Sequence, residues 1–177
     1  IEYAQQEICA HKWIDLSDSN YGVALLNDCK YGYHAKGNRI SMNLLRSQMY
    51  PCADQDKGRH HFRYAIYPHV GTFADSDVCE RAYSFNRPLI LCDCRETGSL
   101  FETDNPRAVI ECIKKSEDGK GVIVRLYNNS DAFEKTVLRT SLPYNRVSVV
   151  DLLENEQGET SLALQLHPFE ILSLRFE

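Results

Sequence analysis

Residues 21–40, YGVALLNDCKYGYHAKGNRI, combine an apolar run, a polar and aromatic segment and a glycine-centred turn. The run Val23 to Leu26 is bounded by turn-forming residues, which is typical of a short β-strand with one face on a core. Lys36-Gly37-Asn38 separates two alternating runs, and Gly and Asn tolerate the positive φ of a tight turn. This stretch therefore predicts a β-hairpin over residues 31–45.

The same short alternation recurs along most of the chain, so the fold class is predicted to be mainly β, with antiparallel β-sandwich portions. Candidate strands are residues 12–16, 22–27, 31–35, 39–45, 61–68, 89–92, 109–115, 121–128, 133–139, 146–151, 161–166 and 170–176. One stretch differs, because an Asp-Ser-Asp cap at residue 75 precedes apolar residues at helical spacing. We expect a short helix over residues 75–86 that ends before Arg87-Pro88.

Two domains are expected, residues 1–98 and 99–177. Between residues 93 and 107 the periodicity is lost and Thr, Gly, Ser, Asn and Pro accumulate, which favours a linker. The second part has strands separated by turns every eight to twelve residues, the spacing of a β-sandwich. The first part has too few strands to close its own sheet, so we expect its edges to pair with chain outside these residues.

Charge and composition exclude several classes of partner. The chain has 20 Lys and Arg against 25 Asp and Glu, a net charge of −5, which leaves no excess of cations for nucleic acid. Its apolar runs are far shorter than the roughly 20 residues of a membrane helix. The first residue is Ile1 and not Met, so we expect a processed or excerpted chain. Seven cysteines, an odd set without a scaffold-like spacing, favour reduced thiols and a cytoplasmic location.

The segment after residue 26 is the strongest candidate for a binding site. Asn27, Asp28, Lys30 and Tyr31 place polar and aromatic side chains at a strand end, where they could hydrogen-bond and stack on a sugar ring. The alternative is that Asn27 and Asp28 start a turn and Lys30 pairs with Asp28. Sequence reasoning leaves both interpretations open.

Neither a metal site nor a catalytic set is predicted for this chain. His60 and His61 lie near Asp54 and Asp56, but adjacent residues of a strand point to opposite faces, so no metal site is predicted there. No pair of carboxylates can be given the roughly 5 Å separation of a retaining glycosidase from spacing. A nucleophile elbow, a P-loop and a zinc-protease motif are also missing from the sequence.

Several blocks of sequence, in order, resemble one enzyme family. They are HKWIDLS at 11–17, YGVALLNDCKYGY at 21–33, SMNLLR at 41–46, GRHHFRYAIYPH at 58–69, VVDLLE at 149–154 and HPFEI at 167–171. Together they resemble the C-terminal region of the class II, zinc-dependent α-mannosidases of glycoside hydrolase family 38. The likeness is greater to the cytosolic and bacterial branch than to the Golgi and lysosomal enzymes.

The resemblance implies a non-catalytic part of a retaining α-mannosidase. In that family the zinc, the nucleophile and the acid/base lie in an N-terminal barrel, which a helical bundle and large β domains follow. Residues 1–98 would then end a supersandwich-like β domain and residues 99–177 form a small β-sandwich. The implied partners are the barrel and helical domains and a mannose-containing glycan, which the block at residues 27–31 would approach. We expect the isolated chain to be inactive.

The alternative function is a free-standing carbohydrate-binding or interaction module without catalysis. Ten tyrosines, one tryptophan and a β architecture favour it. A homo-oligomer is left open, because an uncovered apolar surface on the first part would promote self-association.

Overall fold

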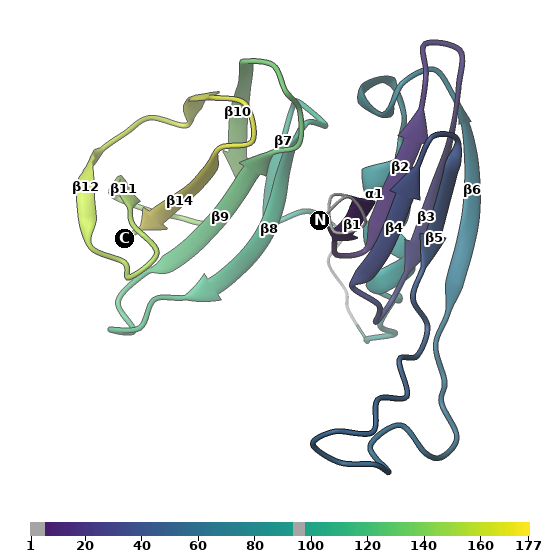
Figure 1. Cartoon of the computed structure of the whole chain (residues 1–177). Helices are drawn as coiled ribbons and strands as arrows, with labels where there is room; N and C mark the ends of the chain where they lie inside the picture. Colours follow the sequence, from purple (N-terminus) through teal and green to yellow (C-terminus); the bar gives the residue numbers. More distant parts are fainter. Residues whose placement is uncertain (1–5, 94–97) are drawn as a thin grey trace. The chain divides into compact units, whose positions relative to one another are not determined.

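The computed structural model describes residues 6–93 and 98–177, and the chain divides into two compact units, residues 1–92 and 93–177 (Figure 1). Antiparallel strands dominate both units, with one α-helix among the described residues, as the sequence predicts. The division lies at Cys92 and Asp93. A functional domain boundary near Ser99 stays a prediction.

The first unit consists of two three-stranded sheets and a helix. One sheet has the order β1-β4-β5, and the other the order β2-β3-β6. The strands are β1 (Glu7–Cys9), β2 (Trp13–Ser17), β3 (Tyr21–Asn27), β4 (Gly32–Lys36), β5 (Arg39–Met42) and β6 (Tyr64–Val70). The hairpin β4–β5 confirms the prediction, with Lys36 paired to Arg39 and Gly37 at a φ of +56° in the turn.

The core of the first unit lies between β3 and the helix α1 (Val78–Asn86). Alternate residues of β3, Ala24 and Leu26, are buried against Val78 and Ala82 of α1. Trp13 of β2 and the aromatic residues Tyr67, Phe73 and Phe85 pack around this cluster. The core is therefore small and lies on one side of the β2-β3-β6 sheet.

The second unit is a sandwich of a five-stranded sheet, β12-β11-β14-β9-β8, and a three-stranded sheet, β13-β10-β7. Its strands are β7 (Phe101–Thr103), β8 (Ala108–Lys115), β9 (Val122–Asn128), β10 (Glu134–Thr140), β11 (Val147–Val150), β12 (Glu156–Glu159), β13 (Ala163–Leu166) and β14 (Ile171–Phe176). Its core takes residues from both sheets: Phe101, Ala108, Val124, Leu126, Leu138, Val147, Leu164, Leu166, Leu174 and Phe176.

Some sequence predictions were wrong. Residues 89–92, predicted as a strand, form none: Leu89, Ile90 and Leu91 are exposed and pair with no strand of the described chain. The helix begins at Val78 and not at residue 75, because residues 73–75 form a separate 3₁₀ turn, η2 (Phe73–Asp75). Three short strands, β1, β7 and β12, were not predicted, since each has only three or four residues and little apolar alternation.

Candidate functional site

Asn27 ends β3 and holds the next loop in place. Its side chain is 1% exposed, and Oδ1 accepts the backbone N–H of Cys29 (3.0 Å) and of Lys30 (2.5 Å). Its Nδ2 donates to the hydroxyl of Tyr33, which in turn donates to the Lys30 carbonyl (3.3 Å). Burial raises the pKa of the Tyr33 phenol. The turn predicted at Asn27 is thus present, and the Asn27 amide is engaged by its own neighbours.

Asp28 pairs with Arg63 and not with Lys30. The Arg63 Nε donates to Asp28 Oδ2 (2.9 Å), and the backbone N–H of Arg63 donates to Oδ1 (3.1 Å). The Arg63 guanidinium also lies 5.0 Å from the Phe85 ring centroid and donates to the Phe85 carbonyl. Hydrogen bonding from Arg63 lowers the pKa of Asp28 to about 2. The pair fastens the start of β6 to the end of β3, so the partner of Asp28 is not the Lys30 that the alternative interpretation gives it.

Lys30 and Tyr31 are the two predicted site residues that reach the surface of this loop. The Lys30 Nζ lies over the ring of Phe62, 4.9 Å from its centroid. The Tyr31 ring is exposed and lies 4.7 Å from the imidazole of His11. The loop therefore presents one cation and one aromatic ring, while Asn27 and Asp28 hold it.

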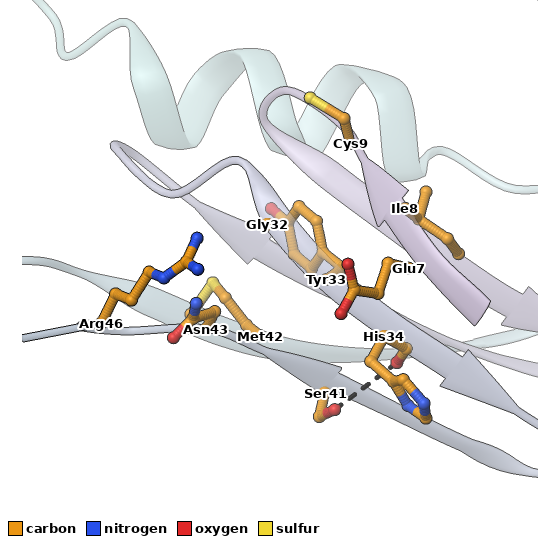
Figure 2. A pocket seen from close by; sticks show the side chains of 10 residues that line it. All are labelled: Glu7, Ile8, Cys9, Gly32, Tyr33, His34, Ser41, Met42, Asn43 and Arg46. Atoms are coloured by element: carbon orange, nitrogen blue, oxygen red, sulfur yellow. Dashed lines mark hydrogen bonds between the residues drawn. The ribbon is translucent and has the colours of Figure 1, made fainter. Parts of the chain in front are cut away.

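A pocket of about 680 Å³ opens on the sheet beside this loop (Figure 2). It is formed by β1, β4, β5 and the residues that follow β5, and it is lined by Glu7, Ile8, Cys9, Gly32, Tyr33, His34, Ser41, Met42, Asn43 and Arg46. Figure 2 shows Glu7 and Arg46 on opposite sides of the Tyr33 ring. Tyr33, whose phenol anchors Asn27, is thus also one of the residues that line the pocket.

The pocket carries complementary polar groups on neighbouring strands. Glu7 of β1 is paired in register with His34 of β4, and His34 with Ser41 of β5. The His34 ring is 3.1 Å from the side-chain oxygen of Gln6, and the Ser41 hydroxyl donates to the His34 carbonyl (3.5 Å). A carboxylate, a hydroxyl and a guanidinium together supply the acceptors and donors that a polyhydroxylated ligand needs.

Arg46 connects this pocket to the predicted loop. It lines the pocket and also a neighbouring depression that contains Lys30 and Asp56. Of the four predicted residues, Lys30 borders that depression, and Asn27 reaches the pocket through Tyr33. Glu7, His34 and Arg46 were missed by the sequence analysis, because only the β1-β4-β5 pairing brings them together. The neighbouring glycine-centred hairpin was the available signal.

The histidines do not form a metal site in the described residues. In these two stretches of chain, no group of three or more His, Cys, Asp or Glu side chains is placed to hold one ion. His60 is exposed and lies beside the Asp56 carbonyl (2.8 Å). His69 is buried and pairs with Asp15 at 2.7 Å, on the core side of its sheet. This donor set does not fit the zinc ion that the resemblance implies for the family.

Two family profiles match the chain in order. The glycosyl hydrolases family 38 C-terminal domain matches residues 1–54, and the family 38 C-terminal beta sandwich domain matches residues 107–174. The second match coincides with the two-sheet architecture of the second unit.

Curated relatives extend the match over nearly the whole chain. Alpha-mannosidase 2C1 of mouse is 38% identical over 98% of this chain, and alpha-mannosidase G of Dictyostelium discoideum is 36% identical over 99%. The chain spans 18% of the length of each of these relatives.

A solved structure of an alpha-mannosidase from Enterococcus faecalis has the same fold over 97% of this chain, with a TM-score of 0.79 and 20% identity, and the match covers 21% of that chain. Another Enterococcus faecalis protein of glycosyl hydrolase family 38 gives a TM-score of 0.78 over 99% of this chain. With both profiles in their order and a relative 38% identical, the chain belongs to the C-terminal region of glycoside hydrolase family 38.

Proposed function

We propose that the chain is the non-catalytic C-terminal β portion of a retaining α-mannosidase, which hydrolyses terminal α-mannose residues. The observation that carries the proposal is the ordered match of both family 38 C-terminal profiles. The relatives at 36–38% identity are named alpha-mannosidases, and about four fifths of their length lies outside the match. The nucleophile, the acid/base and the zinc belong to that other part, where a covalent mannosyl intermediate would form.

The first unit contributes to the rim of the substrate site. In this role Asn27 and Asp28 position the loop, through Tyr33 and Arg63, while Lys30 and Tyr31 face the glycan. The neighbouring pocket supports this assignment because its side chains include both donors and acceptors for sugar hydroxyls. The partners are then the barrel and helical domains of the same polypeptide and a mannose-containing glycan.

A cytoplasmic location is part of the proposal. In the part of the chain that the structure describes, the free thiols include Cys9, Cys29, Cys52, Cys92 and Cys112. Cys94 lies outside the described residues. Reduced cysteines are typical of a cytosolic protein. None of the helices in the described segments is long and apolar enough to cross a membrane.

The decisive experiment compares the 177-residue chain with the complete polypeptide in an aryl α-mannoside assay with added zinc. We expect turnover by the complete polypeptide and none by this chain. Turnover by the chain alone would overturn its non-catalytic role, and an inactive complete polypeptide would overturn the assignment to α-mannosidases. Calorimetric titration of the chain with mannose and mannobiose tests the alternative, since a free-standing module must bind sugar without its neighbours.

The rim is tested separately with Arg46→Met in the complete polypeptide. Losing an exposed guanidinium contact raises KM about three- to ten-fold, which corresponds to roughly 0.7–1.4 kcal/mol, with little change in kcat. Arg139→Met is the matched control, since Arg139 is an exposed cation on β10 of the second unit. An unchanged KM for Arg46→Met would remove the pocket from the rim.

A further inference from the structure

The β4–β5 hairpin brings two cationic side chains to its open end. Lys30 lies shortly before β4, and Arg46 lies shortly after β5. The hairpin pairing continues beyond the strands, because the Asn43 N–H donates to the Gly32 carbonyl (2.9 Å). Both cations line one depression of about 590 Å³, which the long connection between β5 and β6 borders (Figure 1). The fold therefore gathers two positive charges from separate segments of the chain around one hollow.

Two hydrogen bonds hold the loop that forms this depression. The Ser47 N–H donates to Asp56 Oδ2 (2.6 Å), and the Gln55 Nε2 donates to the Gln48 carbonyl (3.3 Å). Both bonds join the outgoing part of the connection between β5 and β6 to its returning part. The depression is therefore shaped by the loop itself, and a ligand would find it already formed.

The two cations of the depression have no acidic partner. Within the ranges that the structure describes, neither the Lys30 ammonium nor the Arg46 guanidinium forms an ion pair. Of the described residues that line the depression, Asp56 alone is acidic, so two cations against one carboxylate leave an excess of one positive charge.

Other arginines of this acidic chain are neutralised by carboxylates. Arginines with such partners are Arg63, Arg81, Arg107, Arg146 and Arg175. The chain as a whole has a net charge of −5, so a local excess of positive charge stands against its general balance. The depression is thus an electrostatic site for an anion.

We propose that this depression binds a phosphate group, carried by the glycan as a phosphate ester or free in solution. The inference deepens the proposed function and rests on it for the assignment of this loop to the rim of the substrate site. A phosphate ester carries close to two negative charges at neutral pH. Its oxygens match the forked donors of a guanidinium such as Arg46, and the Lys30 ammonium supplies a second, point-like charge. The adjacent pocket, which shares Arg46, holds the neutral part of the sugar.

The test is a calorimetric titration of the complete polypeptide with methyl α-mannoside, mannose 6-phosphate and inorganic phosphate. Two exposed charge contacts, each worth a factor of about three, should make mannose 6-phosphate bind about ten-fold more tightly than methyl α-mannoside. The double substitution Lys30→Met and Arg46→Met should reduce this ratio of affinities to about one. Lost contacts to the neutral sugar weaken both ligands alike, so the ratio reports the charges alone.

The matched control is Lys36→Met with Arg39→Met. This pair removes the same two charge types from exposed positions at the turn end of the same hairpin, and it should leave the ratio unchanged. Should the double variant at Lys30 and Arg46 fail to fold, each single substitution should still lower the ratio about three-fold. The charge-preserving variant Lys30→Arg with Arg46→Lys should keep a ratio above about three.

The two sources of phosphate give different results. Inorganic phosphate that binds as tightly as mannose 6-phosphate, and loses this affinity in the double variant, would assign the depression to free phosphate. Inorganic phosphate that binds more weakly would assign it to a phosphorylated glycan.

Three results would overturn the proposal. They are a ratio near one in the unmodified polypeptide, a ratio that the double variant leaves unchanged, and an equal fall of the ratio in the control. The second result would also reveal phosphate bound elsewhere in the polypeptide. Binding constants do not depend on turnover of an aryl α-mannoside, so failure of the phosphate site and failure of the proposed reaction are distinguishable.

Discussion

Both units bury one side of their antiparallel sheets, but to different extents. In the second unit a five-stranded and a three-stranded sheet share a core to which ten buried residues contribute. In the first unit the buried cluster has four residues, and β6 presents apolar side chains to solvent. Stability scales with the apolar area removed from water, so the second unit is the self-sufficient one.

Both units nevertheless end a core strand with the same device. Asn27, the last residue of β3, and Asn128, the last residue of β9, are both buried, at 1% and 0% exposure. The Asn128 Nδ2 donates to the carbonyls of Ala132 (2.7 Å) and His167 (2.9 Å), and its Oδ1 accepts the N–H of Ser130 (2.9 Å). Local loop anchoring is thus common to both units, and the difference lies in core closure.

The largest effect is expected from Phe176→Ala in the second unit. Phe176 is 2% exposed and makes edge contacts with Phe101 and Tyr144, each at 5.2 Å between ring centroids. The cavity and the lost transfer energy lower the free energy of unfolding by about 3–5 kcal/mol. Urea unfolding followed by circular dichroism measures this loss.

Trp13 is the only tryptophan and lies in the first unit, so its fluorescence reports that unit separately. If the two units unfold independently, Phe176→Ala does not change the urea midpoint that Trp13 fluorescence reports. A Trp13 midpoint that moves with the circular dichroism signal would show a single cooperative body and would break the comparison.

Gly22→Ala should damage the first unit next. Gly22 pairs with His69 across β3 and β6, and an added Cβ would lie 2.2 Å from His69 Cε1 and 2.6 Å from Ser17 Cβ. Both side chains are packed in place, His69 by its 2.7 Å contact with Asp15. Overpacking of this kind costs about 1–3 kcal/mol, read from urea titration of Trp13 fluorescence.

The matched control for that substitution is Gly32→Ala on β4, where the new Cβ would meet only Asn43 at an ordinary 3.7 Å. A Gly32→Ala loss as large as the Gly22→Ala loss would mean that the strand conformation, and not the close approach of His69, requires glycine.

Asn27→Ala and Asn128→Ala test the shared device. Each substitution removes a side-chain amide that hydrogen-bonds to buried backbone or hydroxyl groups. We expect the free energy of unfolding to fall by about 1–3 kcal/mol. Asn27→Ala should lower the Trp13 midpoint, and Asn128→Ala should lower only the circular dichroism midpoint. Asn129→Ala serves as the control, because Asn129 is the next residue in the chain and is less buried than Asn128. Equal shifts from Asn128 and Asn129 would contradict the anchoring role.

Apolar alternation predicted the long strands, because period-two patterning survives wherever one face is buried. β3 and β9 were therefore predicted within one residue of their bounds. The apolar run at residues 89–92 was misinterpreted, since a strand requires a partner that no local pattern reveals. β1, at Glu7–Cys9, is defined only by its pairing with β4.

The candidate site was predictable at the loop and not in the pocket. The turn chemistry of Asn27 is local, so the sequence reveals it. The partner of Asp28 lies 35 positions away, and the meeting of Glu7 with His34 depends on strand register. Long-range pairing of this kind depends on how the strands of the sheet align. Residues next to Asp28 in the sequence, such as Lys30, therefore did not reveal its partner.

The smallest effect is expected at the ion pairs. Each unit has a carboxylate that is paired with an arginine and has a lowered pKa. Asp28 has its pKa lowered to about 2, first by the hydrogen bond from Arg63. Asp118 of the second unit has its pKa lowered by the Ser116 hydroxyl and then by Arg175. A depressed carboxyl pKa stabilises the fold above the ordinary value of 3.8 and loses that contribution as the pH falls toward the folded-state pKa of Asp28. Arg63 is 61% exposed, so solvent screening limits the contribution to under about 1 kcal/mol.

Arg63→Met should raise the pKa of Asp28 from about 2 toward 3.8, measured by an NMR titration of the Asp28 carboxyl. The stability of the variant then becomes less dependent on pH between about pH 4 and pH 2. Arg175→Met is the control, and it should leave Asp28 unmoved while raising the pKa of Asp118. A variant Asp28 that still titrates near 2 would show that the backbone N–H of residue 63 is sufficient. The attachment of β6 to β3 would then depend on the backbone N–H of Arg63 and not on its guanidinium.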